Sequence, residues 1–240
     1  MIETLAETGS TNADLIARVR SGERVIEGNW LVADRQTAGK GRQGRTWFDG
    51  AGNFMGSTAV FPHERDPSPP SLALVAGLAL YETVLGLHAK PAELSLKWPN
   101  DLLLNGAKLA GILLEREGDA IVVGIGVNLA KAPALPDRRT TALSSFGPAP
   151  DRDHFAQSLA AHFASELERW RQYGLAPIIR RWLAAAHPEG TALRVHPPGE
   201  GSVEGTFAGL TVDGALSLRL PDGETRIIHA GDVMLVQEEG

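Results

Sequence analysis

The chain has 240 residues, a net charge of −6 at pH 7 and no cysteine. Its length suits one large domain plus a small one, the negative charge argues against broad nucleic-acid binding, and the lack of cysteine excludes disulfides, thiolate metal sites and a cysteine nucleophile. The start carries no signal peptide and no apolar stretch is long enough to span a bilayer, so we expect a cytoplasmic protein that does not bind membranes.

The first predicted elements are a short strand at residues 2–7 and a helix that begins at Ser10 or Thr11. Either hydroxyl can cap this helix, and Asp14 follows Thr11 by three residues, as in a capping box. Capping is the ordinary interpretation of these hydroxyls. The alternative is that they bind a small polar ligand at the helix N-terminus. A strand at residues 29–34 comes next.

Residues 36–47 combine three glycines, three cations and one aromatic side chain. Glycine lets backbone N–H groups approach a ligand closely, and arginine and lysine suit phosphate or carboxylate. Gly39, Gly41 and Gly44 fit a dinucleotide-binding spacing, but the turn-rich residues 46–53 cannot form the helix that it needs. A Walker A loop is excluded because glycine follows the lysine. We predict an anion-binding loop, with a solvated basic loop as the alternative.

The middle of the chain is predicted to form a buried helix at residues 71–87, followed in the chain by an antiparallel meander. A strand is expected at residues 54–60, before the helix. The strands of the meander are expected at residues 94–98, 102–104, from 107 onward and at 120–128, with a two-residue hairpin turn at Asn105-Gly106. Lys108 lies just past that turn in an otherwise apolar strand. Its default interpretation is a stem that covers the sheet while the ammonium reaches water. The ordinary interpretation of Asn128 is a cap at the end of its strand.

The C-terminal part begins with a loop in which Arg138-Arg139 is expected to be solvated, followed by helices at residues 155–173 and 177–186. Five short β segments then predict a small barrel; they are residues 192–196, 202–210, 215–220, 225–229 and 233–236. We place a domain boundary near residue 188. These patterns predict an α/β protein with a small β-barrel, and taken alone they leave the function open.

Five motifs resemble those of biotin protein ligases in order and spacing. They are Ser10-Thr11-Asn12, Gly39-Lys40-Gly41-Arg42-Gln43-Gly44-Arg45, Lys97-Trp98-Pro99-Asn100-Asp101, Lys108-Leu109-Ala110-Gly111-Ile112-Leu113-Leu114-Glu115 and Gly124-Ile125-Gly126-Val127-Asn128. The resemblance runs from about residue 5 to the C-terminus. It implies a catalytic domain at residues 1–188, with a mixed, largely antiparallel sheet and flanking helices of the class II synthetase type, and an SH3-like barrel at residues 189–240.

The resemblance also implies a two-step reaction. Biotin would react with ATP to give biotinyl-5′-AMP, and a lysine of a biotin carboxyl carrier protein would then take the biotinyl group. Mg²⁺ would accompany ATP, without certain protein ligands. A homodimer is possible.

Site residues follow from the resemblance position by position. Those implied to bind biotin are Ser10, Thr11, Asn12, Gln36, Lys40, Gly41, Arg42 and Lys108. Those implied to bind ATP or the adenylate are Gly39, Arg42, Arg45, Trp47, Asn100, Asp101, Lys108 and Asn128. Arg42 and Lys108 are the expected catalytic pair. Lys108 would lie between the carboxylate and the α-phosphate, and Trp47 would help to close the loop.

Two departures and two alternatives accompany this interpretation. The family loop usually has arginine where this chain has Lys40. Bifunctional relatives carry a winged-helix domain before the catalytic core, whereas here the first motif begins at Ser10, so we expect neither operator binding nor repression. A ligase for lipoate or octanoate is one alternative. A non-catalytic biotin-binding module is the other, and the joint presence of Arg42 and Lys108 counts against it.

Overall fold

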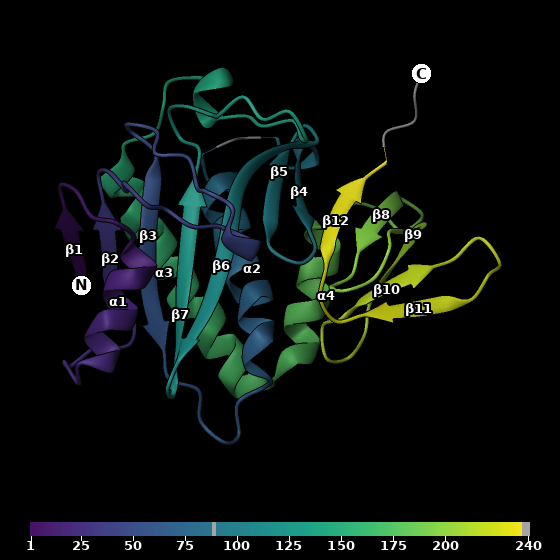
Figure 1. The fold of residues 1–240 in the computed structure, drawn as a ribbon, viewed down its shortest axis with the longest axis horizontal. Coiled ribbons are helices and arrows are strands. Elements are labelled where there is room, and N and C mark those ends of the chain that lie inside the picture. The colour runs from purple at the N-terminus through teal and green to yellow at the C-terminus, as the bar shows by residue number, and fades with distance from the viewer. Residues whose placement is uncertain (88–89, 237–240) are drawn as a thin grey trace.

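The computed structural model describes residues 1–87 and 90–236 and contains a seven-stranded mixed sheet (Figure 1). The strand order is β1-β2-β3-β7-β6-β5-β4, with β1 parallel to β2 and the other neighbours antiparallel. The strands are β1 (Ile2–Leu5), β2 (Trp30–Ala33), β3 (Phe54–Val60), β4 (Leu94–Lys97), β5 (Asp101–Leu104), β6 (Ala107–Glu117) and β7 (Ala120–Val127). The predicted mixed, largely antiparallel sheet with flanking helices is confirmed.

Helices cover both faces of this sheet. Figure 1 shows α1 (Thr11–Arg20) on one face and α2 (Leu72–Leu85), α3 (Arg152–Tyr173) and α4 (Leu175–Ala185) on the other. The helix α2 is apolar almost all round because it lies between the sheet and the two later helices, and this burial explains its lack of a polar stripe. Short 3₁₀ turns occupy Arg42–Gly44, Pro69–Ser71, Pro91–Glu93 and Leu143–Ser145.

The start of α1 is capped by Ser10, whose side chain accepts a hydrogen bond from the backbone N–H of Ala13. Thr11 is the first helical residue, and the Asp14 carboxylate accepts a hydrogen bond from the Thr8 hydroxyl at 2.5 Å. The capping box that pairs Thr11 with Asp14 is therefore wrong. Because Ser10 performs the capping, the Thr11 side chain is available for another role.

The hairpin between β5 and β6 turns at Asn105-Gly106, as predicted. Both residues have positive φ, 51° and 71°, which is the backbone of a type I′ turn. The turn sets the pairing of Lys108 with Leu103, and a register shift follows between Leu103 and Leu102. This register determines which face of β6 carries the Lys108 side chain.

The C-terminal strands form a second, antiparallel sheet beside α4 (Figure 1). They are β8 (Ala192–His196), β9 (Val203–Leu210), β10 (Leu216–Arg219), β11 (Thr225–Ile228) and β12 (Asp232–Leu235), in the order β11-β10-β9-β8-β12. The five predicted strands are present. Within the described residues no strand pairing joins β11 to β12, so the closed barrel is not confirmed.

Two cores hold the layers together. A large core fills the space between the first sheet, the helices α2 to α4 and the second sheet, and it includes the α3 side chains Phe155, Phe163 and Trp170. A smaller core under α1 contains Leu15, Leu31 and Val122. Nowhere in the described ranges does a helix combine the length and apolarity needed to cross a bilayer.

His187 is a buried titratable group where α4 leads into the second sheet. Its ring packs against Phe207 of β9, with the ring centroids 4.4 Å apart. Burial lowers the pKa of His187 from 6.5 to about 4. Because the folded state disfavours the imidazolium, the stability that His187 contributes is complete above pH 6.5 and is lost as the pH falls through 4.

Replacing His187 with leucine should therefore make unfolding less sensitive to acid. We expect the wild type to lose on the order of 3 kcal/mol of unfolding free energy at this site between pH 7 and pH 4, a loss that His187→Leu avoids. Urea unfolding of both proteins across this pH range measures the difference. His229→Leu, at an exposed histidine that directly follows β11, is the control. A difference in unfolding free energy between His187→Leu and the wild type that does not change with pH would refute this role of His187.

Candidate active site

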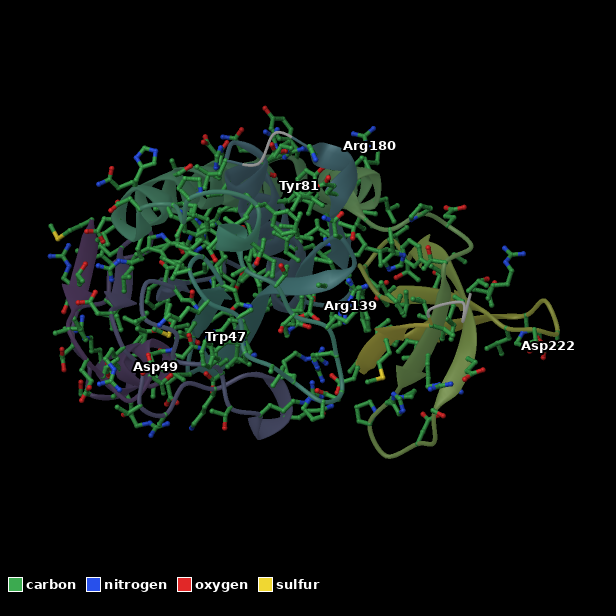
Figure 2. All side chains as sticks on the ribbon, turned by 90° about the horizontal axis from the view of Figure 1, so that it is seen from above. Trp47, Asp49, Tyr81, Arg139, Arg180 and Asp222 are labelled. Atoms are coloured by element: carbon green, nitrogen blue, oxygen red, sulfur yellow. The ribbon has the colours of Figure 1, made fainter. Side chains whose placement is uncertain are left out.

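A cavity of about 1370 Å³ runs across the first sheet, from the start of α1 to the start of β12. Three regions line it. We call them the polar end (Thr11, Asn12, Gln36, Ser57), the glycine floor (Gly111, Gly124, Gly126) and the cationic end (Arg42, Arg45, Lys97, Asp101, Lys108). Figure 2 shows Trp47 toward the inside of the molecule and Arg139 on the side that faces the C-terminal strands.

The polar end is a buried network of uncharged side chains. The Thr11 hydroxyl lies 2.6 Å from the Ser57 hydroxyl, which donates a hydrogen bond to Asn12 Oδ1 at 2.6 Å. The Gln36 side-chain oxygen accepts from the Thr11 backbone N–H at 2.7 Å. Asn12 Nδ2 donates to the Glu115 carboxylate at 2.7 Å. Neutral, oriented groups of this kind suit an uncharged polar ligand with its own donors and acceptors.

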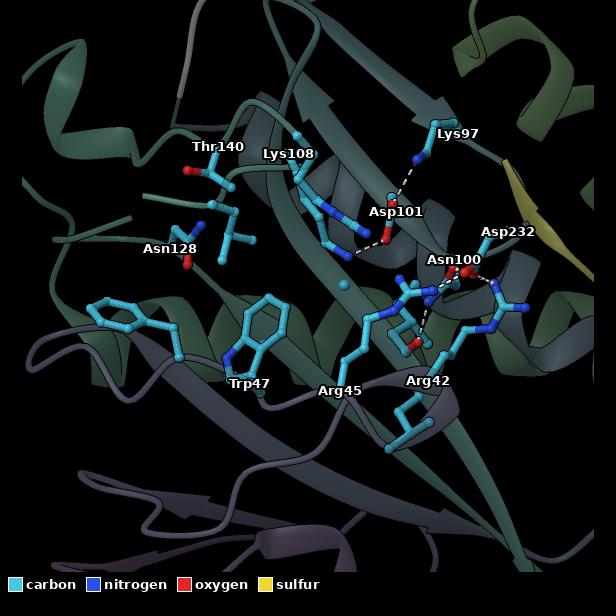
Figure 3. A pocket seen from close by; sticks show the side chains of 18 of the residues that line it. Arg42, Arg45, Trp47, Lys97, Asn100, Asp101, Lys108, Asn128, Thr140 and Asp232 are labelled. Carbon is cyan, nitrogen blue, oxygen red and sulfur yellow. Dashed lines mark hydrogen bonds and ion pairs between the residues drawn. The ribbon is translucent and has the colours of Figure 1, made fainter. Parts of the chain in front are cut away.

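The glycine floor needs glycine at these positions, because any larger residue would collide with side chains that line the cavity. A Cβ atom at Gly124 would lie 2.2 Å from Asn12 Oδ1, and one at Gly126 would lie 2.3 Å from Trp47 Cε2. The indole of Trp47 thus rests on β7, and the Lys108 ammonium lies 5.7 Å from its ring centroid (Figure 3). The buried Trp47 Nε1 has no hydrogen-bond partner within the described part of the chain. The floor offers an apolar path between the two ends.

Asp101 is the centre of the cationic end (Figure 3). Its carboxylate is buried and forms ion pairs with Lys108 at 2.6 Å and Lys97 at 3.0 Å. Burial would raise the pKa of Asp101, but the two ammonium charges outweigh it and hold that pKa well below its usual range. Burial lowers the pKa of Lys108, and the Asp101 carboxylate opposes this shift. Two cations share one anion, so the cluster keeps a positive charge for an incoming anion.

Arg42 reaches the same cluster from the glycine loop. Its guanidinium donates to Asn100 Oδ1 at 3.1 Å and to the Gly231 carbonyl at 2.9 Å, and it lies 3.7 Å from the Asp232 carboxylate. Arg45 also pairs with Asp232 (Figure 3). The first residue of β12 and its neighbour thus position both loop arginines. Asn100 is fixed in turn because its Nδ2 donates to the Ile112 carbonyl at 2.7 Å.

The glycine loop itself contains no helix beyond the turn at Arg42–Gly44, which agrees with the rejection of a dinucleotide fingerprint. The Gly41 N–H donates to the Arg45 carbonyl at 2.7 Å, so the loop uses this donor internally. Lys40 lines the cavity with an exposed side chain. Gly39 does not line it; its carbonyl accepts from the Trp47 N–H at 2.9 Å and holds the loop in place.

A second loop borders the cavity after β7. Asn128 Nδ2 donates to the Thr141 carbonyl at 3.1 Å, while its buried Oδ1 has no hydrogen-bond partner within the described residues. Arg138 and Arg139 both line the cavity, and the Arg138 side chain is half-buried. The expectation that this arginine pair is simply solvated is wrong for Arg138.

The carboxylates of the cavity do not form a metal site. Among residues 1–87 and 90–236 there is no cluster of three or more histidine or carboxylate side chains that could hold a metal ion. Asp101 is paired with two lysines and Asp232 with two arginines. The arrangement fits a ligand that brings its own negative charge.

The cavity thus brings together almost all residues that the sequence singled out. Ser10, Thr11, Asn12 and Gln36 lie at or beside the polar end, and Lys40, Gly41, Arg42, Arg45, Trp47, Asn100, Asp101, Lys108 and Asn128 line the rest. Four further residues were missed. Lys97 was quoted only within a motif, Ser57 stood out only as a hydroxyl in an apolar strand, Arg138 was assigned to solvent, and Asp232 gave no signal.

Comparison with known proteins gives consistent results. The Biotin/lipoate A/B protein ligase family matches residues 11–129, and the Biotin protein ligase C terminal domain matches residues 194–236. A biotin–[acetyl-CoA-carboxylase] ligase of Paracoccus denitrificans is 42% identical over 95% of this chain and 98% of its own length. The enzyme of the same name from Mycobacterium tuberculosis is 38% identical over 97% of this chain and 88% of its own length.

The comparison with solved structures points to the same family as the comparison of sequences. The biotin protein ligase of Aquifex aeolicus in complex with biotin and ATP has a TM-score of 0.86 and 27% identity, with 98% of this chain and 99% of that chain covered. Similarity to these proteins extends over nearly all of both chains, so it includes the second sheet as well as the first. The chain therefore belongs to the biotin protein ligase family.

Proposed function

We propose that this protein activates biotin with ATP as biotinyl-5′-AMP and transfers the biotinyl group to a specific lysine of a biotin carboxyl carrier protein. One observation carries the proposal. A neutral polar end and a cationic end share one cavity, with the glycine floor and the Trp47 indole between them. Biotin has a neutral ureido ring and a carboxylate joined by an apolar chain, so its two ends match the two ends of the cavity. The names of the Paracoccus and Mycobacterium relatives support this assignment.

The first step has to bring two anions together. The biotin carboxylate oxygen attacks the α-phosphorus of ATP, the bond to the β-phosphate breaks and pyrophosphate leaves. Carboxylate and triphosphate repel each other, so the site must supply fixed positive charge both before and during transfer. Lys108 and Arg42 are in a position to do so, because Asp101 orients the first and Asn100 with Gly231 orients the second.

The second step uses a nucleophile from the partner protein. The amine of the carrier lysine attacks the acyl carbon, an amide forms and AMP leaves with the bonding electrons. The cationic end favours AMP as a leaving group because it stabilises the phosphate charge. Trp47 Nε1 and Asn128 Oδ1, which have no hydrogen-bond partner among the described residues, supply polar atoms on the nucleotide side. Mg²⁺ would enter on the ATP phosphates, since the cavity carboxylates are engaged by cations.

The domain division and the partners are also proposals. Residues 1–188 would form the catalytic domain and residues 189–240 an SH3-like module; two separate sheets and two separate family matches support this division. The net charge of −6 disfavours nonspecific DNA binding. The absence of operator binding, pairing of two copies through the sheet and a cytoplasmic location stay predictions.

ATP–pyrophosphate exchange without a carrier protein tests the function directly. We expect exchange that depends on biotin, because adenylate formation is reversible and needs no acceptor. Lipoate and a reaction without acid are the two comparisons. Exchange with lipoate and not with biotin would assign the protein to the other branch of the family. Exchange with neither acid would leave only a non-catalytic binding role.

A further inference from the structure

Ser57 is a fully buried serine of β3 to which the mechanism above gives no role. We propose that Ser57 is a specificity-determining positioning residue, which fixes the direction of the hydrogen bonds at the polar end so that the Thr11 hydroxyl offers a ligand only an acceptor. The inference rests on the proposed function, because the ligand in question is the ureido ring of biotin. Two fixed partners, one at each end of the network, determine the direction.

The first fixed partner is the Glu115 carboxylate, which can only accept hydrogen bonds. The Asn12 amide must therefore turn its Nδ2 toward Glu115, where the distance is 2.7 Å, and its Oδ1 toward Ser57. Since an amide oxygen only accepts, the 2.6 Å contact between Ser57 Oγ and Asn12 Oδ1 uses the single hydroxyl proton of Ser57.

The second fixed partner is the backbone N–H of Thr11, which can only donate. It orients the Gln36 side chain with Oε1 toward Thr11, at 2.7 Å. The Thr11 and Ser57 hydroxyl oxygens lie 2.6 Å apart, and one proton must lie between them. The Ser57 proton is already used, so Thr11 donates. Gln36 Oε1 lies farther from the Thr11 hydroxyl, at 3.1 Å, and is the weaker acceptor.

The network cannot readily reverse, because its hydroxyl and amide groups are buried. Reversing any one of these hydrogen bonds would place two acceptors next to each other or leave a donor without a partner. In a buried site either arrangement is destabilising. Gly124 faces Ser57 across the β3–β7 pairing, and a side chain there would lie 2.2 Å from Asn12 Oδ1. The missing side chain at Gly124 thus leaves the space that the Asn12 amide occupies.

The consequence is a rule for the ligand. Because its hydroxyl proton is donated to Ser57 Oγ, Thr11 can accept a hydrogen bond from a ligand N–H, such as either ureido nitrogen carries. It cannot donate a hydrogen bond to a ring oxygen. An analogue in which oxygen replaces one ureido N–H, a cyclic carbamate, would set acceptor against acceptor at Thr11. The rejection of that analogue depends on Ser57, although Thr11 makes the contact.

Titration calorimetry with biotin and its two regioisomeric carbamates tests this rule. We expect the wild type to bind biotin at least about 100-fold more tightly than one of the carbamates. In Ser57→Ala only the weaker acceptor Gln36 Oε1, at 3.1 Å, remains for the Thr11 hydroxyl. The hydroxyl can then turn and donate to the ligand, so that preference should fall below about tenfold. In the exchange reaction, Ser57→Ala should raise KM for biotin and leave kcat within about twofold, because the cationic end is unchanged.

Two variants control for a merely structural effect. Thr58→Val removes the next hydroxyl of β3, which is equally buried and donates to the Asn29 carbonyl at 2.7 Å outside the cavity. It should lower thermal stability without changing the ligand preference. Ser57→Thr keeps a hydroxyl and should restore the preference.

The outcomes are decisive even if Ser57→Ala folds poorly. Equal binding of biotin and both carbamates by the wild type would overturn the rule. So would a Ser57→Ala protein that weakens biotin and both carbamates by the same factor. A wild type that binds no biotin would overturn the proposed function itself, and this result is distinct from the other two.

Discussion

Replacing Lys108 with alanine is expected to lower kcat for biotin-dependent pyrophosphate exchange about 10³-fold. The half-buried ammonium lies between Gly111 of the glycine floor and Asp101, 2.6 Å from that carboxylate. Its charge interacts with the reacting oxygens in a site of low dielectric, where water cannot replace it. KM for biotin should change less than kcat, because the polar end still holds the ureido ring.

The control for Lys108 is Lys90→Ala, at an exposed lysine outside the cavity, which should exchange at the wild-type rate. Lys108→Arg keeps the charge and should recover part of the activity, since a guanidinium cannot occupy the position of an ammonium without shifting. Thermal unfolding of each variant separates loss of the fold from loss of chemistry. Unchanged turnover in a folded Lys108→Ala protein would remove Lys108 from the site.

The second large effect is expected for Arg42→Gly, which should release the adenylate into solution. The Arg42 side chain is anchored at Asn100 and Gly231 and lines the cavity. A charge-assisted contact to the adenylate phosphate is worth about 10- to 100-fold in its rate of release. Adenylate formation itself should continue at a reduced rate, because Lys97 and Lys108 remain.

Rapid desalting after a single turnover measures the fraction of biotinyl-5′-AMP that stays bound. Biotin labelling of lysines on an unrelated bystander protein gives a second readout, since free adenylate reacts without selection. Arg65→Gly, in an exposed loop outside the cavity, should behave as the wild type does. If the intermediate leaves Arg42→Gly no faster than it leaves the wild type, Arg42 is not its clamp.

Local patterns in the sequence predicted the elements well. Asn105-Gly106 forms the expected type I′ turn because only a few residues adopt positive φ in succession. The strand at Ala192–His196 has the predicted bounds, since alternation of buried and exposed side chains is a property of neighbours in the chain. The start of α1 shows the limit of such rules: Ser10 and Thr11 are both good caps, and only tertiary contacts of Thr11 decide between them.

Two of the residues that sequence reasoning missed, Ser57 and Asp232, depend on contacts between distant segments. Ser57 meets Thr11 across 46 positions, and the loop arginines meet Asp232 from the opposite end of the chain. No local period encodes such a meeting. The barrel is a similar case, because closure depends on whether the edge strands β11 and β12 meet. A strand pattern alone does not contain that information.

The hydrogen bond from Arg42 to Gly231 spans 189 positions, and this separation has a consequence for how the enzyme forms. A ribosome makes a chain at about 5–20 residues per second, and domains tend to fold as they emerge. The segments that carry the glycine floor and the polar end are all made before residue 231. The contact that orients Arg42, the proposed clamp on the adenylate, can form only afterwards, so we expect a nascent chain to hold biotin before it can retain an adenylate.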